Sequence, residues 1–237
     1  MTRRRWIADE VTNERAALTG GHAAHLSRTL RARVGQEFEV ICRNQVRRAT
    51  VFSVTDERVE FDLGEEIAAG AAAPITLLLA VFKFDRMEWA IEKCTELNVS
   101  AIVPVIARRT GKHLALAAQK RAERWRRIAR EASEQARRVT PPEIGDPVKL
   151  AAALETAAGL RIVLAESERE VQLGEILREH PELQSLALAI GPEGGWATDE
   201  IQMFDKARWL AASLGGTILR AETAAIAALA IARAEIT

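Results

Sequence analysis

The sequence predicts an α/β protein in two parts, a small antiparallel β domain followed by a larger domain with a mainly parallel sheet. Residues 36–63 contain short segments in which apolar and polar residues alternate, the pattern of strands with one buried face. After residue 74, apolar runs alternate with amphipathic helical stretches. This alternation indicates a mainly parallel sheet with helices on both faces.

An Ala/Gly-rich stretch separates the two parts. Residues 64–74, "GEEIAAGAAAP", end in a proline and have the composition of a linker. We therefore expect a domain boundary near residue 72, which gives one domain over residues 1–72 and another over 73–237. In the first domain, residues 22–34 have helical spacing before the predicted strands begin.

The larger domain is expected to begin with a strand and end with an Ala-rich helix. Its predicted strands cover residues 75–82, 101–106, 161–166, 186–190 and 207–214. Its predicted helices cover residues 85–98, 116–138, 148–157, 173–178, a stretch starting at Thr198, and 221–236. Thr198, followed by Asp199 and Glu200, fits a helix N-cap with acidic residues in the first turn.

Composition limits the possible functions. Hydrophobic residues make up 48% of the 237 residues, and 33 Lys and Arg balance 33 Asp and Glu, so any basic surface must be local. Two distant cysteines, Cys42 and Cys94, form no zinc or disulfide pattern, and no metal site is expected. Without a secretory h-region or an apolar run long enough to span a bilayer, the sequence favours a cytoplasmic protein with no membrane partner.

Two glycine-rich segments follow predicted strands near the C-terminus. The first is "LAIGPEGGWATDEI", residues 188–201, and the second begins with "SLGGTILRAETA" at Ser213. Each connects the carboxyl end of a predicted strand to a predicted helix. Parallel sheets bind ligands at the carboxyl ends of their strands. Neither contains GxxxxGK[ST] or a GxGxxG that opens a helix, so a nucleotide-phosphate site has little support. Either segment alone is also compatible with an ordinary tight turn.

The two segments together resemble the ribosomal RNA small-subunit methyltransferase E family, of the SPOUT class. "HLSRTLR", "DRMEWAIEKCTEL", Arg109, "REASEQARR" and "PPEI" resemble family blocks in the family's order. The resemblance implies a PUA-like β-barrel at the N-terminus and a C-terminal SPOUT domain with a trefoil knot. It also implies a homodimer that uses S-adenosylmethionine to methylate N3 of a uridine in 16S rRNA of the small ribosomal subunit.

The resemblance carries expected roles onto residues of this chain. Bare backbone and apolar walls would hold the cofactor, and Arg220 with Glu193 would act on the target base, with Arg220 favouring the anionic form of uracil. The expected cofactor-binding residues are Leu164, Gly191, Pro192, Glu193, Gly194, Gly195, Leu214, Gly215, Ile218, Leu219, Glu222, Thr223 and Ala224. Arg220 could instead pair with an acid or a phosphate, and Glu193 could simply accept backbone N–H groups.

Local basic stretches suggest where RNA could bind. Residues 1–48 contain ten Lys or Arg against five Asp or Glu, and residues 116–138 contain eight against three. We expect RNA contacts from Arg5, His25, Arg28, Arg31, Arg109 and Arg138. His25, Arg28 and Arg31 would lie close to one helical face, although a solvated basic face is the commoner role of such charges.

Departures from the family pattern leave other functions open. Gly216 and Thr217 stand where the family usually has Pro and Arg, which removes a stiffening ring and a possible phosphate or base contact. One alternative is a non-catalytic RNA-binding or ribosome-assembly protein with the same fold. Another is a SPOUT methyltransferase that acts on a different RNA position.

Overall fold

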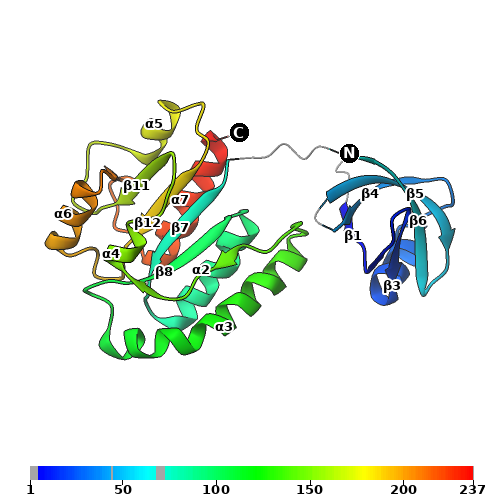
Figure 1. The fold of residues 1–237 in the computed structure, drawn as a ribbon, viewed down its shortest axis with the longest axis horizontal. Coiled ribbons are helices and arrows are strands. Elements are labelled where there is room, and N and C mark those ends of the chain that lie inside the picture. The colour runs from blue at the N-terminus through cyan, green and yellow to red at the C-terminus, as the bar shows by residue number, and fades with distance from the viewer. Residues whose placement is uncertain (1–4, 44, 68–72, 237) are drawn as a thin grey trace. The chain divides into compact units, whose positions relative to one another are not determined.

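The computed structural model describes residues 5–43, 45–67 and 73–236, and the side chain of Arg5 lies outside that description. The chain divides into two compact units, Met1–Ala71 and Ala72–Thr237. The boundary expected near residue 72 falls within residues 68–72, which lie outside the described residues. Figure 1 labels the elements of each unit.

The first unit contains a six-stranded sheet in the order β1-β4-β5-β6-β3-β2. All its neighbouring strands are antiparallel except β1 and β4, which run parallel. The sheet is curled, as Figure 1 shows. Because the end strands β1 and β2 do not pair with each other in this order, the described strands form a half-barrel and not a closed barrel. The strands are β1 (Arg5–Ile7), β2 (Glu10–Val11), β3 (Arg15–Thr19), β4 (Glu37–Cys42), β5 (Gln45–Val54) and β6 (Arg58–Glu66).

A short helical segment packs on this sheet. It consists of α1 (Gly20–Ala24) and one π-helical turn, η1 (His25–Thr29), in which the Leu30 amide donates to the His25 carbonyl over 3.2 Å. Leu26 is fully buried in a core with Trp6 and Phe61. The helix ends well before residue 34, so the predicted 22–34 helix is too long.

The second unit is a layered α/β structure with a parallel sheet. Its strands are β7 (Ile75–Ala80), β8 (Ala101–Ile106), β9 (Glu143–Ile144), β10 (Val148–Lys149), β11 (Leu160–Leu164), β12 (Leu186–Ile190) and β13 (Leu210–Ala212). Its helices are α2 (Phe84–Glu96), α3 (Lys112–Gln135), α4 (Leu150–Ala153), α5 (Leu173–Arg178), α6 (Thr198–Lys206) and α7 (Ala221–Glu235). Together with the first unit, these elements confirm the predicted fold class.

The parallel sheet separates two apolar cores. Its order is β10-β8-β7-β12-β11-β13, with β9 paired to β8. On β7, Leu77 and Leu79 pack against α2, α3, α5 and α7, while Leu78 and Ala80 pack against α4 and α6. Side chains on a strand alternate between faces, so one strand that is apolar except for Thr76 supplies both cores. This is why the sequence of β7 shows no polar alternation.

Two local predictions are wrong. The helix expected over residues 148–157 is a short edge strand, β10, followed by the single turn α4. Val148 pairs in parallel with Val105 of β8, so the sheet edge captures the first two residues. At α6 the N-cap is Ala197 rather than Thr198, and the Ala197 amide donates to the Glu200 carboxylate over 2.9 Å.

The chain crosses the sheet edge between its last strand and its last helix. β13 is the edge strand beside β11, whereas α7 packs near β12, α2 and α5. Residues 213–220 therefore pass across the carboxyl ends of β11 and β12. This crossing belongs to the C-terminal part of the chain, where the resemblance implies a trefoil knot. Across the described residues, no helix has the length and apolar character needed to cross a membrane.

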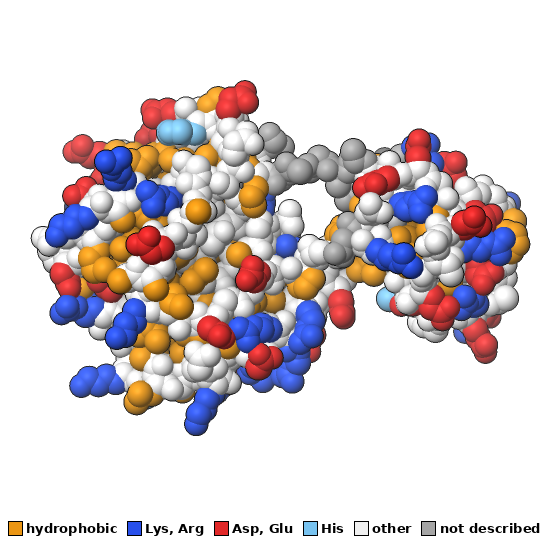
Figure 2. Space-filling view, in the orientation of Figure 1, with side chains coloured by type: hydrophobic (Ala, Val, Ile, Leu, Met, Phe, Trp, Pro, Cys, Tyr) orange, Lys and Arg blue, Asp and Glu red, His pale blue; other side chains and the backbone are white. Residues whose placement is uncertain are grey.

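Surface charge is mixed in both units. Figure 2 shows Lys and Arg side chains interspersed with Asp and Glu on the face in view. Many cations of α3 are paired locally: Arg124 donates to Glu88 over 2.6 Å, and Arg126 donates to Asp146 over 2.7 Å. The basic count of this helix therefore overstates the charge that it offers to RNA.

Candidate functional site

The first glycine-rich loop, residues 191–197, is a tight turn at the carboxyl end of β12. The Gly195 amide donates to the Pro192 carbonyl over 2.8 Å, and Gly195 has a φ of 69°, which favours glycine. Gly191 lies in a crowded position for a different reason. A Cβ on Gly191 would lie 3.3 Å from the indole nitrogen of Trp196, so even an alanine there would be tightly packed against the buried ring.

Side chains from two other segments hold this first loop in place. The Glu200 carboxylate, only 4% exposed, accepts from the Ala197 amide and, over 2.8 Å, from the Arg108 amide. Arg109 donates to the Gly194 carbonyl over 2.6 Å. Because buried amides that lose an acceptor are costly, these contacts fix the loop against the segment that follows β8.

The second loop, residues 213–220, has far fewer contacts. The Ser213 hydroxyl accepts from the Gly215 amide over 3.2 Å, and Gly215 has a φ of 118°. Gly216 has neither a positive φ nor a neighbour within 4 Å of an added Cβ, so nothing in the structure requires glycine there. Ile218 is 84% exposed, an unusual state for a large apolar side chain.

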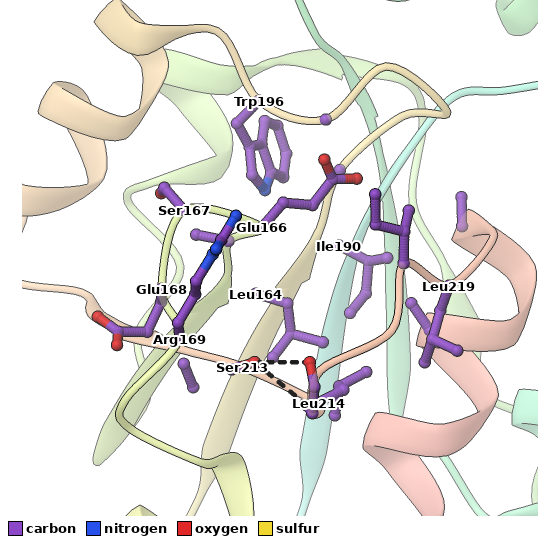
Figure 3. A pocket seen from close by; sticks show the side chains of 18 of the residues that line it. Leu164, Glu166, Ser167, Glu168, Arg169, Ile190, Trp196, Ser213, Leu214 and Leu219 are labelled. Atoms are coloured by element: carbon purple, nitrogen blue, oxygen red, sulfur yellow. Dashed lines mark hydrogen bonds between the residues drawn. The ribbon is translucent and has the colours of Figure 1, made fainter.

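The two loops share one cavity of about 630 Å³ at the carboxyl ends of β11, β12 and β13. Figure 3 shows Leu164, Ile190, Leu214 and Leu219 among its apolar lining, opposite a polar side formed by residues 166–169 and Trp196. An apolar hollow of this size with a few polar groups has the usual properties of a small-molecule site. Its position at the strand carboxyl ends is the one expected for a parallel sheet.

Most residues expected to bind the cofactor line this cavity, and three do not. Those that line it are Leu164, Gly191, Pro192, Glu193, Gly195, Leu214, Gly215, Ile218, Leu219 and Ala224. Gly194 presents its carbonyl to Arg109, Thr223 is exposed on α7, and Glu222 is buried next to α2. These three residues are therefore outside the cavity lining.

A charged cluster links the first loop to the start of α7. Arg86, on α2, donates to the Glu193 carboxylate over 3.2 Å, and its Nε lies 3.7 Å from a carboxylate oxygen of Glu222. The Glu222 side chain is 6% exposed, and its second carboxylate oxygen has no hydrogen-bond partner among the described residues. Arg86 therefore connects three elements through one guanidinium.

Arg220 is the N-cap residue of α7 and lies at the end of the second loop. It is exposed, and its carbonyl accepts from the Ala224 amide over 2.8 Å. Over the part of the chain that the structure describes, its guanidinium makes no ion pair or side-chain hydrogen bond. It is therefore available to an external ligand.

The expected basic face of the first unit is not formed as predicted. His25 and Arg28 belong to η1, but Arg31 lies beyond its end with a φ of 52°, so the three do not share one helical face. Arg28 forms an exposed ion pair of 2.9 Å with Asp56, which raises the pKa of Arg28. The Arg5 side chain lies outside the described residues.

Arg109 and Arg138, both expected to contact RNA, are engaged within the protein. Arg109 lines the cavity and holds the first loop. Arg138 donates to the carbonyls of Thr95 and Val99 over 2.9 and 2.7 Å. Burial, with a smaller effect of Arg233, lowers the pKa of Arg138 to about 10. Its guanidinium supports the turn after α2 instead of facing solvent.

Several site residues escape sequence reasoning. Glu166, Ser167, Glu168 and Arg169 line the cavity directly after β11, where the strand-end rule could have located them. Glu168 orders this segment by accepting from the amides of Glu170 and Val171, which lowers the pKa of its carboxyl. Trp196 and Ile201 also line the cavity. Arg86 lies in the family-like block "DRMEWAIEKCTEL", but it is distant in sequence from both loops and the sequence predicts no role for it.

The described residues contain no group of three or more His, Cys, Asp or Glu side chains that could hold a metal ion. The described cavity side chains are instead apolar groups, hydroxyls, carboxylates and guanidinium groups. Such a set suits an organic ligand.

Comparison with known proteins defines the class first. The model of the RNA methyltransferase domain family matches residues 70–233. The chain is 31% identical to ribosomal RNA small subunit methyltransferase E of Synechocystis sp., over 94% of this chain and 74% of that protein. It is 30% identical to the Bacillus subtilis protein of the same name, over 90% of this chain and 87% of that protein. The chain therefore belongs to the ribosomal RNA small subunit methyltransferase E family.

A solved structure shares the architecture. The Neisseria gonorrhoeae ribosomal RNA small subunit methyltransferase E, bound to S-adenosyl methionine, is 29% identical with a TM-score of 0.69. The match covers 95% of this chain and 94% of that one. A Legionella pneumophila protein, solved in complex with the same cofactor, has a TM-score of 0.67 at 28% identity, over 97% of this chain and 96% of that one.

Proposed function

We propose that this protein transfers the methyl group of S-adenosylmethionine to N3 of a uridine in 16S rRNA of the small ribosomal subunit. The observation that carries the proposal is the single cavity formed by both glycine-rich loops at the strand carboxyl ends. Membership of the rRNA methyltransferase family supports the reaction class. The uridine N3 position rests on the resemblance of the loop motifs.

The cavity residues fit the proposed cofactor. Leu164, Leu214 and Leu219 offer an apolar surface for adenine, and the first loop brings backbone close to it. The largely exposed Ile218 and the buried, unpartnered indole N–H of Trp196 are both groups that a ligand in this cavity would cover or satisfy. S-adenosylmethionine supplies a methyl group activated by its sulfonium centre.

Arg220 is the proposed catalytic residue. The uridine N3 must lose its proton to become nucleophilic, and a nearby guanidinium favours the resulting anion by charge and by hydrogen bonds to the carbonyls of the base. Arg220 is exposed at the rim of the second loop, and no described side chain occupies its guanidinium. Orientation and charge would then provide much of the rate.

Glu193 is proposed to orient the first loop and, through it, the target base. One oxygen of its carboxylate already binds Arg86, which also faces Glu222. Because the Arg86 guanidinium already engages this carboxylate, we assign Glu193 a positioning role. Arg86 thereby becomes a positioning residue, since it controls Glu193 from α2.

The RNA surface, the oligomeric state and the domain roles are further parts of the proposal. The first unit, as a PUA-like domain, would bind RNA through the surface that carries His25, Arg28 and Arg31, which are all exposed. Arg5 belongs to the same proposed set. A homodimer and a cytoplasmic location stay predictions from the sequence.

The deciding experiment supplies unmodified small ribosomal subunits and S-adenosylmethionine with a labelled methyl group, and then maps the label at nucleotide resolution. We expect one labelled uridine, methylated at N3. Label on another nucleotide would support a different target position. Calorimetric binding of the cofactor without transfer to subunits or free 16S rRNA would support the non-catalytic alternative.

Arg220→Ala should slow transfer by about 100-fold or more, the usual effect of removing a transition-state hydrogen-bond donor. Cofactor affinity, measured by calorimetry, should stay within about twofold, because Arg220 lies outside the cavity lining. Arg220→Lys is the matched variant: it keeps the charge but loses the planar fork, and should recover part of the rate. Unchanged turnover of Arg220→Ala would remove this residue from the mechanism.

A further inference from the structure

Trp196 has a polar group with no partner inside the cavity wall. Its side chain belongs to a residue that is 7% exposed, and its indole nitrogen has no hydrogen-bond partner among the described residues. Trp125 and Trp209 share this property, but of these three only Trp196 lines the cavity. Figure 3 shows its indole nitrogen directed into the cavity, toward the side chain of Glu166.

Glu166 presents a carboxylate to the same part of the cavity. A Cβ on Gly195 would lie 3.7 Å from its carboxyl carbon, and a Cβ on Gly191 would lie 3.3 Å from the Trp196 nitrogen. Both polar groups therefore lie against glycines of the first loop. Among the described residues, Glu166 forms no hydrogen bond or ion pair.

Trp196 and Glu166 thus offer one donor and one acceptor next to each other. An indole N–H can only donate, and an ionised carboxylate can only accept. A ligand group that satisfies both must be able to accept and to donate, as neighbouring hydroxyl groups can. The methionine part of the cofactor also carries an acceptor, its carboxylate, and a donor, its ammonium, so deoxy ligands are needed to distinguish it from the ribose.

We infer that Trp196 and Glu166 recognise the ribose diol of the cofactor, and so select a ribonucleoside over its deoxy forms. The inference rests on the proposed function, because it assigns a part of the same ligand. One hydroxyl accepts from the indole N–H and the other donates to the carboxylate. The exposed carboxylate exchanges water for this bond, whereas the buried N–H gains a partner it lacks, which strengthens binding.

The test is calorimetric binding of S-adenosylhomocysteine to the full chain and to paired variants. Trp196→Phe keeps an aromatic ring and removes the N–H, and we expect it to weaken binding about three- to tenfold. Glu166→Gln keeps an acceptor oxygen but loses the charge, and because this group is exposed we expect a smaller loss of affinity, about threefold. These readouts do not depend on methyl transfer.

Two control variants separate recognition from folding. Trp209 packs against Phe204 on the side opposite Trp196, with ring centroids 5.3 and 4.9 Å away, and lies outside the cavity lining. Trp209→Phe should therefore disturb the same core but leave affinity unchanged. Glu170→Gln removes a charge from the same loop outside the lining, and it should leave affinity unchanged as well.

Deoxy ligands identify the group that is read. The 2′-deoxy and 3′-deoxy forms of S-adenosylhomocysteine each lack one hydroxyl. The form that lacks the hydroxyl paired with the indole N–H should bind Trp196→Phe and the unmodified protein equally well. If the loss persists with both forms, or if Trp196→Phe binds S-adenosylhomocysteine as well as the unmodified chain does, the ribose assignment is wrong. If the unmodified chain binds neither S-adenosylhomocysteine nor S-adenosylmethionine, the proposed function itself fails.

Discussion

The two glycine-rich loops border one cavity but are organised differently. Residues 191–197 are fixed by Glu200 and Arg109, and the Trp196 side chain of this loop is buried. Residues 215–218 are all exposed, and the second loop has Ser213 as its main internal hydrogen-bond partner. Two glycine-rich loops therefore form one preformed side of the cavity and one side with few internal contacts.

This difference indicates how the site would respond to a ligand. A preformed loop loses little conformational freedom on binding, whereas a sparsely bonded loop must gain its contacts from the ligand. The exposed Ile218 belongs to the second kind of wall, since an apolar ligand surface would cover it. We expect the first loop to set the position of the ligand and the second to close over it.

Loss of the buried acceptor at Glu200 should have the largest effect. Glu200→Gln keeps the shape but places an amide donor against one of two backbone N–H groups, so the free energy of unfolding should fall by about 2–3 kcal/mol. Urea unfolding followed by circular dichroism measures this change. The neighbouring Asp199→Asn breaks only an exposed 2.7 Å pair with Arg108 and should cost less than about 1 kcal/mol. Equal effects would mean that Glu200 does not hold the loop.

Hydrogen exchange should distinguish the two loops directly. At about 100 times the dissociation constant, S-adenosylhomocysteine can stabilise a locally open segment by up to about 2.7 kcal/mol. Amides of residues 214–219 should then exchange more slowly by a large factor, while those of 195 and 197, already bonded, should change less. Similar protection of both loops on binding would contradict the comparison.

A pair of adjacent glycines provides the smallest test. Gly215→Ala forces an alanine into a φ of 118° and should lower the free energy of unfolding by about 1 kcal/mol. Gly216→Ala meets neither strain nor a neighbour, so it should be neutral or slightly stabilising. Thermal unfolding of both variants measures the difference. A larger cost at Gly216 would show that the second loop is more tightly packed than its few contacts indicate.

Sequence reasoning located the site where local rules apply. Strand β12 and helix α5 have the predicted bounds, and most expected lining residues follow the ends of β11, β12 and β13. Apolar runs and glycines act through their immediate neighbours, so a single sequence is sufficient to recognise them. The knot and the cofactor, by contrast, came only from resemblance to a family.

Long-range pairing explains what the sequence alone missed. Arg86 and Glu193 are 107 positions apart, and nothing near either residue reveals the other. Val148 joins a strand because Val105 lies beside it, although its local pattern is helical. Arg138 looks like a surface cation in the sequence, yet the carbonyls that it binds become available only when α2 ends beside it.

The strand order of the larger unit has a consequence for synthesis on the ribosome. Central strand β7 pairs with β8, which follows it closely, but also with β12, whose first paired residue is Leu186. Arg233 then donates to the Ala73 carbonyl, 160 positions earlier. One edge of β7 therefore stays unpaired until the ribosome has synthesised β12. An unpaired strand edge makes a nascent chain prone to aggregate.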